Sequence, residues 1–108
     1  MNESRRRDST AICYAILKAA TGGQRKTRIM YQARLNLNQL NARIESLVAC
    51  DLMVRQPVGH YFSTTERGIA FTRMYEKARE TEDILLEQKN ALESFLTPRV
   101  KRSVEVAA

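Results

Sequence analysis

The chain is poor in the residues that build metal centres and disulfide frameworks. It has one histidine and two cysteines in 108 residues. Cys13 and Cys50 lie far apart in the sequence and have no Cys-x-x-Cys spacing. A structural zinc ion takes four nitrogen or sulfur ligands, which this composition does not supply. We therefore predict no metal site and no cofactor. The two thiols are expected to be reduced and mostly buried, since a disulfide would need an oxidising compartment.

Long apolar runs are also missing. No stretch approaches the roughly 20 apolar residues that a membrane-spanning helix requires, although 44% of the residues are hydrophobic. The segment MNESRRRDST is basic, but the apolar core of a signal peptide does not follow it. We therefore expect a cytoplasmic protein with no membrane partner.

Residue combinations typical of catalysis are not evident either. The sequence offers no Ser/His/Asp set, no glycine-rich phosphate loop and no carboxylate pair beside a histidine cluster. The acidic residues of the last third are spread around a predicted helix, which is typical of a solvated surface. We predict that the protein is not an enzyme, and no small-molecule substrate is evident.

Positive charge is what the sequence has in excess. The formal net charge is +6, and the segment RKTRIMYQAR at residues 25–34 has four basic side chains and no acidic one. Residues 66–96 instead hold five basic and seven acidic side chains, a net charge of −2. A basic region separate from a near-neutral one indicates a nucleic-acid-binding face and a helix with another role. A basic composition that arose by chance is the alternative.

Three helices are predicted in the first half of the chain. Asp8 or Ser9 caps a helix over TAICYAILKAA, and the segment TGG ends it. Thr27 caps a short helix over RIMYQA. Asn36 and Gln39 have the spacing of a capping box for the next helix. The predicted core residues at helical spacing are Ile12, Cys13, Ile16, Leu17 and Ala20, followed by Leu37, Leu40, Ile44, Leu47 and Val48.

The short connection between the second and third helices is that of a helix-turn-helix, although an ordinary helical hairpin fits it equally well. The segments DLMVRQP and YFST then predict two strands, joined by a turn at Gly59. A hairpin in this place is the wing of a winged helix. We predict a mostly α (α+β) fold with a winged helix-turn-helix head, a two-stranded wing and a long C-terminal coiled-coil helix.

The last helix is predicted to begin at Glu66, where Thr65 caps it and Gly68 permits a close approach to a neighbour. Its thirty residues would extend about 45 Å. Apolar residues recur every seven positions, which is typical of a coiled coil. A helix folded back on the head is the alternative, and the residues leave the direction of the coil open. The predicted dimer interface is Phe71, Met74, Tyr75, Ala78, Thr81, Leu85, Gln88, Leu92 and Phe95.

These elements divide the chain into three parts. Residues 1–65 are the head with an N-terminal basic arm, residues 66–97 the dimerisation helix, and residues 98–108 a disordered basic tail. The outer face of the third helix is predicted to enter the major groove of DNA, whereas basic residues around it contact phosphates. The predicted groove residues are Asn38, Gln39, Ala42, Arg43 and Ser46, and the phosphate contacts are Arg25, Lys26, Arg28, Arg34, Arg55 and His60.

Four short segments in one order carry a resemblance to a known family. They are KTRIM, the L-N-x-x-Q-L start of the third helix, LVACDL before the wing, and TERG after it. Over residues 9–96 the chain resembles the small archaeal winged helix-turn-helix DNA-binding proteins of the 10a chromatin-protein type. The resemblance implies a homodimer joined by an antiparallel coiled coil, with a winged-helix head at each end. It also implies a double-stranded DNA partner and a chromatin-like role or a role in transcription regulation.

Three functions therefore remain to be compared. The first is a weakly specific binder of double-stranded DNA that associates with the nucleoid. The second is a winged-helix module for protein–protein interaction with no direct DNA role. The third is a ligand-responsive repressor, for which no residue identifies an effector.

Overall fold

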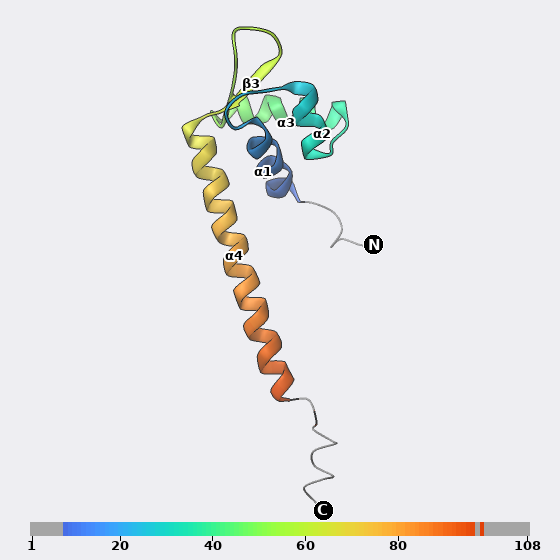
Figure 1. Ribbon diagram of the computed structural model, residues 1–108, viewed down its shortest axis with the longest axis vertical. Coiled ribbons are helices and arrows are strands. Elements are labelled where there is room, and N and C mark those ends of the chain that lie inside the picture. Colours follow the sequence, from blue (N-terminus) through green and yellow to red (C-terminus); the bar gives the residue numbers. More distant parts are fainter. Residues whose placement is uncertain (1–7, 97, 99–108) are drawn as a thin grey trace, which may run out of the picture. The chain divides into compact units, whose positions relative to one another are not determined.

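The computed structural model describes residues 8–96 and 98, so the predicted arm at 1–7 and nearly all of the predicted tail lie outside it. The elements in chain order are α1 (Ser9–Ala20), β1 (Gln24–Arg25), α2 (Lys26–Ala33), α3 (Leu37–Ala49), β2 (Met53–Arg55), β3 (Tyr61–Thr64) and α4 (Glu66–Phe95) (Figure 1). This order confirms the predicted winged helix-turn-helix fold. The chain divides into two compact units, with the boundary after Glu76.

The ends of α1 follow the sequence prediction. The Asp8 carboxylate accepts a hydrogen bond from the Ala11 N–H at 2.8 Å, which satisfies one of the unpaired amides of the first turn. After Ala20 the chain reaches Gly22 and Gly23, which have φ angles of 85° and 98°. Only glycine adopts such backbone angles without strain, so the helix ends here.

The start of α2 differs from the prediction. The N-cap is Arg25, which makes no side-chain capping bond, and Thr27 lies inside the first turn. The predicted Thr27 cap is therefore wrong. A strand leads directly into the helix instead, because the Lys26 N–H donates to the His60 carbonyl at 3.0 Å. At its other end α2 stops at Arg34, whose φ of 58° is in the left-handed region.

The capping box of α3 is confirmed. The Gln39 N–H donates to Asn36 Oδ1 at 2.8 Å, and the Asn36 N–H donates to Gln39 Oε1 at 3.0 Å. The prediction that Leu37 lies in the core is wrong, because this residue is 52% exposed. It occupies the first position of the helix, at the edge of the core. The remaining predicted core residues of α3 are buried or half-buried, namely Leu40, Ile44, Leu47 and Val48.

The wing belongs to a three-stranded antiparallel sheet in the order β1–β3–β2. The hairpin of β2 and β3 was predicted, and Met53 pairs with Thr64 across it. The third strand was not predicted, because two residues carry no strand pattern of their own. Those residues, Gln24 and Arg25, become a strand only by pairing with Phe62 and Tyr61 of β3.

One hydrophobic core holds the three short helices against the sheet. A buried hydrogen bond joins the two layers, because the Thr64 hydroxyl donates to the Leu17 carbonyl at 2.7 Å. Burial of apolar surface is the main stabilising contribution to such a small head. The buried apolar side chains are Ile16, Leu17, Ala20, Ile29, Ala33, Leu35, Leu40, Ile44, Leu47, Met53 and Phe62.

The first turn of α4 is fixed to the head at Thr65 and Gly68, as predicted. The Thr65 hydroxyl oxygen accepts from the Gly68 N–H at 3.0 Å, and the hydroxyl donates to the Asp51 carbonyl at 2.7 Å. A Cβ atom added at Gly68 would lie 2.2 Å from the Leu52 carbonyl oxygen and 2.5 Å from Thr64 Cγ2. No larger residue fits this close approach.

The next turns of α4 lie against α1. The rings of Tyr14 and Tyr75 stack with centroids 4.4 Å apart, and the Tyr14 hydroxyl donates to the Glu76 carboxylate at 2.6 Å. Lys18 pairs with the same carboxylate at 3.0 Å. Phe71 packs on the core. The sequence placed the limit of the head at residue 65, and in the structure its compact unit reaches Glu76.

These contacts change the acidity of Glu76. The hydrogen bond from Tyr14, and after it the bond and charge of Lys18, hold the pKa of the Glu76 carboxyl below its usual value. Both partners favour the charged form of the carboxylate.

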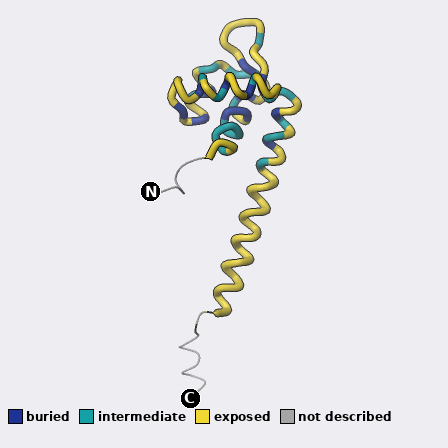
Figure 2. Tube along the Cα trace, turned by 180° about the vertical axis from the view of Figure 1, so that it is seen from behind, coloured by how far each residue is buried: buried dark blue, intermediate teal, exposed yellow. Residues whose placement is uncertain are grey.

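The second half of α4 has no core within the chain. Every residue from Lys77 to Leu96 is exposed, and Figure 2 shows this part of the helix in one colour. At least half of each large apolar side chain here is open to solvent: Ile84, Leu85, Leu86, Leu92, Phe95 and Leu96. Within the described residues, no helix is long and apolar enough to cross a membrane.

The two cysteines are free thiols. Cys13 is half-buried in α1, but Cys50 is exposed, so the prediction of buried thiols is wrong for Cys50. That residue is the C-cap of α3, where the chain leaves the core.

Candidate nucleic-acid interface

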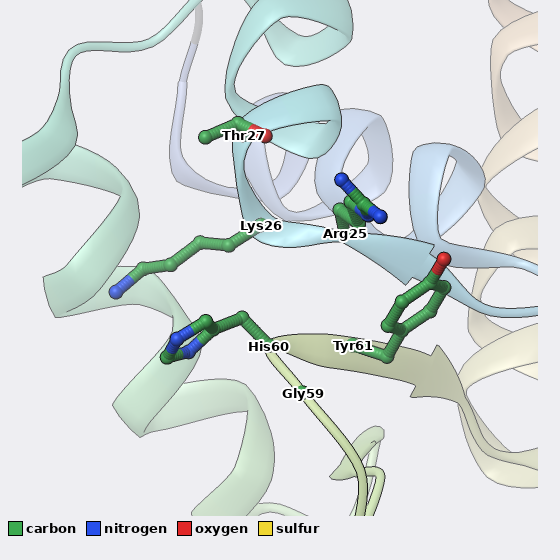
Figure 3. A pocket seen from close by; sticks show the side chains of 6 residues that line it. All are labelled: Arg25, Lys26, Thr27, Gly59, His60 and Tyr61. Atoms are coloured by element: carbon green, nitrogen blue, oxygen red, sulfur yellow. The ribbon is translucent and has the colours of Figure 1, made fainter.

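A hollow of about 520 Å³ lies where the start of α2 meets the wing. Figure 3 shows the Lys26 and His60 side chains extending to the same side, while Arg25 lies beside Tyr61. The Arg25 guanidinium carbon is 5.7 Å from the centroid of the Tyr61 ring, within the range of a cation–π contact. The residues that line the hollow are Arg25, Lys26, Thr27, Gly59, His60 and Tyr61.

Backbone pairing fixes the charged residues of this hollow. Arg25 stands opposite Tyr61 in the β1–β3 ladder, and the Lys26 N–H is bonded to the His60 carbonyl at 3.0 Å. Two cations and an imidazole are thus held together by strand geometry. The lining includes no acidic residue. Such a site attracts phosphate groups, because each cation that contacts a phosphate releases a counterion.

The other two predicted phosphate residues of α2 lie outside the hollow. Arg28 is exposed in the first turn of the helix, and Arg34 is exposed at its C-terminal end. The structure therefore brings together Arg25, Lys26 and His60, and leaves these two arginines along α2.

The outer face of α3 contains the predicted groove residues. Asn38, Gln39, Ala42 and Ser46 are exposed. The side-chain oxygen of Gln39 already accepts a hydrogen bond from the Asn36 N–H in the capping box. Arg43 is half-buried and donates to the Ser9 hydroxyl of α1 at 2.6 Å. This face therefore presents amides and small side chains, with its one arginine held at the edge.

The wing residue Arg55 is already paired. Its guanidinium lies 3.0 Å from the Glu45 carboxylate of α3 and 5.3 Å from the centroid of the Phe62 ring. Glu45 lies on α3 and Arg55 on β2, and only the fold brings them together. The ion pair lowers the positive charge that Arg55 offers to a phosphate.

The described residues hold no cluster of three or more histidine, cysteine, aspartate or glutamate side chains that could bind a metal ion.

The family profile of the winged helix-turn-helix matches residues 6–83. The chain belongs to this winged helix-turn-helix family. The winged helix-turn-helix family implied by the four short segments and the fold predicted from the order of the elements are thereby confirmed.

Solved winged-helix structures share the architecture at low sequence identity. The DNA-binding protein Sso10a-2 from Sulfolobus solfataricus has a TM-score of 0.76 at 19% identity, covering 85% of this chain and 99% of that one. The zinc-responsive MarR family member ZitR from Lactococcus lactis has a TM-score of 0.55 at 16% identity, covering 95% and 73%. The regulator PcaV from Streptomyces coelicolor, solved with its natural ligand, has a TM-score of 0.55 at 20% identity, covering 96% and 79%. No curated protein matches the chain.

The winged-helix framework assigns a place to each part of the interface. The helix-turn-helix consists of α2 and α3, and the wing is the hairpin of β2 and β3. The hollow lies between the first helix of this motif and the wing. Tyr61, which holds Arg25, was not among the predicted interface residues. The signal available in the sequence was the aromatic pair at the start of the second wing strand.

Proposed function

We propose that this protein binds double-stranded DNA through its winged-helix head and acts as a chromatin-like or regulatory protein of the nucleoid. In this proposal α3 lies in the major groove, as the second helix of a helix-turn-helix does. The wing and the start of α2 follow the phosphate backbone. Family membership supports the proposal, and Sso10a-2, which shares the fold, is a DNA-binding protein.

The hollow is the observation that carries this function. Arg25, Lys26 and His60 come from two separate segments, and the β1–β3 ladder and one backbone hydrogen bond hold them in place. Contacts to phosphates fix the register of a protein on the duplex and supply most of its non-specific affinity. A basic hollow beside the exposed face of α3 provides both.

We further propose a homodimer through the second half of α4. Most helical stability in proteins comes from the packing of an apolar face, so a 30-residue helix whose residues are all exposed from Lys77 onward is expected to pack on a partner. Leu85, Leu92 and Phe95 are at least 59% exposed and follow the heptad positions a, a and d. A second copy of the same helix would cover this stripe. Two heads on one dimer also double the number of phosphate contacts.

DNA binding is tested by titrating a random-sequence duplex with the protein at two salt concentrations, following fluorescence anisotropy. The variant combines Arg25→Ala, Lys26→Ala and Arg28→Ala. We expect weaker binding and a salt dependence whose logarithmic slope falls by about 3 per head, roughly 1 for each lost phosphate contact. Circular dichroism verifies that the variant is folded.

The matched control removes the same charge from the second half of α4, with Lys77→Ala, Arg79→Ala and Lys89→Ala. We expect this control to bind nearly as the unmodified protein does. Equal losses in both triple variants would contradict the assignment of phosphate contacts to the hollow and the first turn of α2, and leave only a general charge effect. A folded dimer that binds no duplex at low salt would contradict the function itself and favour an acidic protein partner.

A further inference from the structure

The exposed face of α3 carries little that reads a G·C pair. Guanine is most often recognised in the major groove by arginine or lysine, which donate to its O6 and N7 atoms. Between Leu37 and Ala49 the helix has one arginine and no lysine. That arginine, Arg43, is half-buried and bonded to Ser9 on the α1 side of the helix.

The acidic residue of the same face, Glu45, is also engaged. Glu45 could accept a hydrogen bond from the cytosine amino group, but its carboxylate lies 3.0 Å from the guanidinium of Arg55. The same pair restrains Arg55 of the wing. Glu45 and Arg55, which could both read a G·C pair, are therefore engaged with each other.

The centre of the face has a different chemistry. The Asn38 side chain is exposed in the first turn of α3. Ala42 follows one turn later on the same face, since residues four apart lie above one another on a helix. Leu37, beside Asn38 at the start of the helix, is 52% exposed. The Asn38 amide, the Ala42 methyl and the exposed part of Leu37 thus lie in the first two turns of α3.

We propose that the head prefers A·T base pairs, with the Asn38 amide bonded to adenine and with Leu37 and Ala42 against thymine methyl groups. The inference rests on the proposed binding of double-stranded DNA. An asparagine amide matches the N6 donor and N7 acceptor of adenine, and the thymine methyl is an apolar group in the same groove. The hollow adds affinity for any sequence, because phosphates carry no base information.

The test uses three duplexes of equal length as competitors in the anisotropy assay. One contains only A·T pairs, one only G·C pairs and one only inosine·cytosine pairs. Equal numbers of phosphates keep the electrostatic contribution equal. An inosine·cytosine pair has the major-groove edge of G·C but lacks the guanine amino group in the minor groove. A reader of the major groove therefore treats it as G·C.

We expect the A·T duplex to bind about tenfold more tightly than either of the others, the size of one good base contact. Asn38→Ala should remove most of this preference by lowering the affinity for the A·T duplex about tenfold. Asn90→Ala, the same substitution in the exposed second half of α4, is the matched control and should keep the preference. Deoxyuridine in place of thymidine removes the methyl groups and should weaken binding to the A·T duplex several-fold.

Each other outcome is equally informative. Equal affinity for all three duplexes would overturn the preference while DNA binding stands. An inosine·cytosine duplex that binds like A·T would also overturn it, because the reading would then come from the minor groove. A preference that survives Asn38→Ala would overturn the proposed contact of Asn38 with adenine. Full affinity for the deoxyuridine duplex would overturn the proposed contacts of Leu37 and Ala42 with thymine methyl groups. Failure to bind any duplex would instead refute the proposed function.

Discussion

The two halves of α4 have the same secondary structure but different surroundings. In the first half Gly68 and Thr72 are buried, and Tyr75 stacks on Tyr14 of α1. In the second half no residue from Lys77 to Leu96 is buried. Tertiary contacts of the head therefore stabilise the first half, whereas the exposed second half gains little from packing within the described chain. One continuous helix thus spans two compact units of the chain.

The largest effect is expected from placing charge on the exposed apolar stripe. Leu85→Asp combined with Leu92→Asp should yield monomers, because each dimer loses four buried leucines. At about 1.5 to 3 kcal/mol for each side chain, the dissociation constant of the dimer should rise by at least roughly ten-thousandfold. Sedimentation equilibrium measures the mass, and the thermal unfolding of the head should change little.

A control with the same added charge separates the stripe from the helix in general. Asn90→Asp with Ser94→Asp lies outside the heptad seam, on exposed positions of the same segment, and should remain dimeric. A persistent dimer in the leucine variant would show that the interface lies elsewhere.

The first half of α4 should instead respond to added volume. Gly68→Ala places a methyl group 2.2 Å from a backbone carbonyl oxygen, and overpacking of this kind costs about 2 to 3 kcal/mol. Urea titration followed by circular dichroism measures the free energy of unfolding. Ala70→Gly, at an exposed position of the same helix, should cost about 1 kcal/mol. If the two variants were equally stable, the close approach at Gly68 would have no energetic importance.

A smaller difference in the free energy of unfolding is expected between substitutions at Thr65, which caps α4, and at Thr81 within it. Thr65→Ala removes the cap of α4 and its bond to Asp51, with an expected loss of about 1 kcal/mol. Thr81→Ala removes an exposed hydroxyl that donates to the Lys77 carbonyl at 3.1 Å. The free energy of unfolding of the head should then change by less than about 0.5 kcal/mol. If both substitutions lowered the free energy of unfolding equally, the stability of the head would depend on α4 beyond Glu76, which would contradict the boundary given by its contacts.

The smallest effect concerns pH at the end of the first half. The folded-state pKa of Glu76 is lowered by Tyr14 and Lys18. The carboxylate therefore contributes stability above its ordinary pKa, and this contribution is lost as the pH falls through the folded-state pKa. Thermal midpoints of Glu76→Gln and the unmodified protein should differ at neutral pH and converge in acid. Tyr14→Phe should reproduce part of this change, and a difference constant with pH would exclude the linkage.

Much of the fold follows from local patterns. Capping residues, glycines and the spacing of apolar residues act within a few positions of each other, so Asp8, the Asn36–Gln39 box and Thr65 were found in advance. The sequence did not reveal β1, because a two-residue strand exists only through its partner. The Thr27 cap was wrong for the same reason. Pairing with β3 fixes the start of α2 and makes a side-chain cap unnecessary.

The candidate interface was predictable by residue type but not by arrangement. The sequence identified the basic segment, the outer face of α3 and the cations of the wing. It could not show that Arg55 is paired with Glu45 or that Arg43 is bonded to Ser9, because both contacts join separate elements. These pairings determine which side chains remain available to DNA.

The sequence by itself determined the order of the elements, the basic head and the heptad stripe of the last helix, because these depend on neighbours within one or two turns. Only the tertiary structure decided that Lys26 and His60 share one hollow, that Tyr75 belongs to the head, and that α4 loses intramolecular contacts after Glu76. The physical reason is that such contacts depend on packing between elements distant in the chain. Local patterns do not specify that packing.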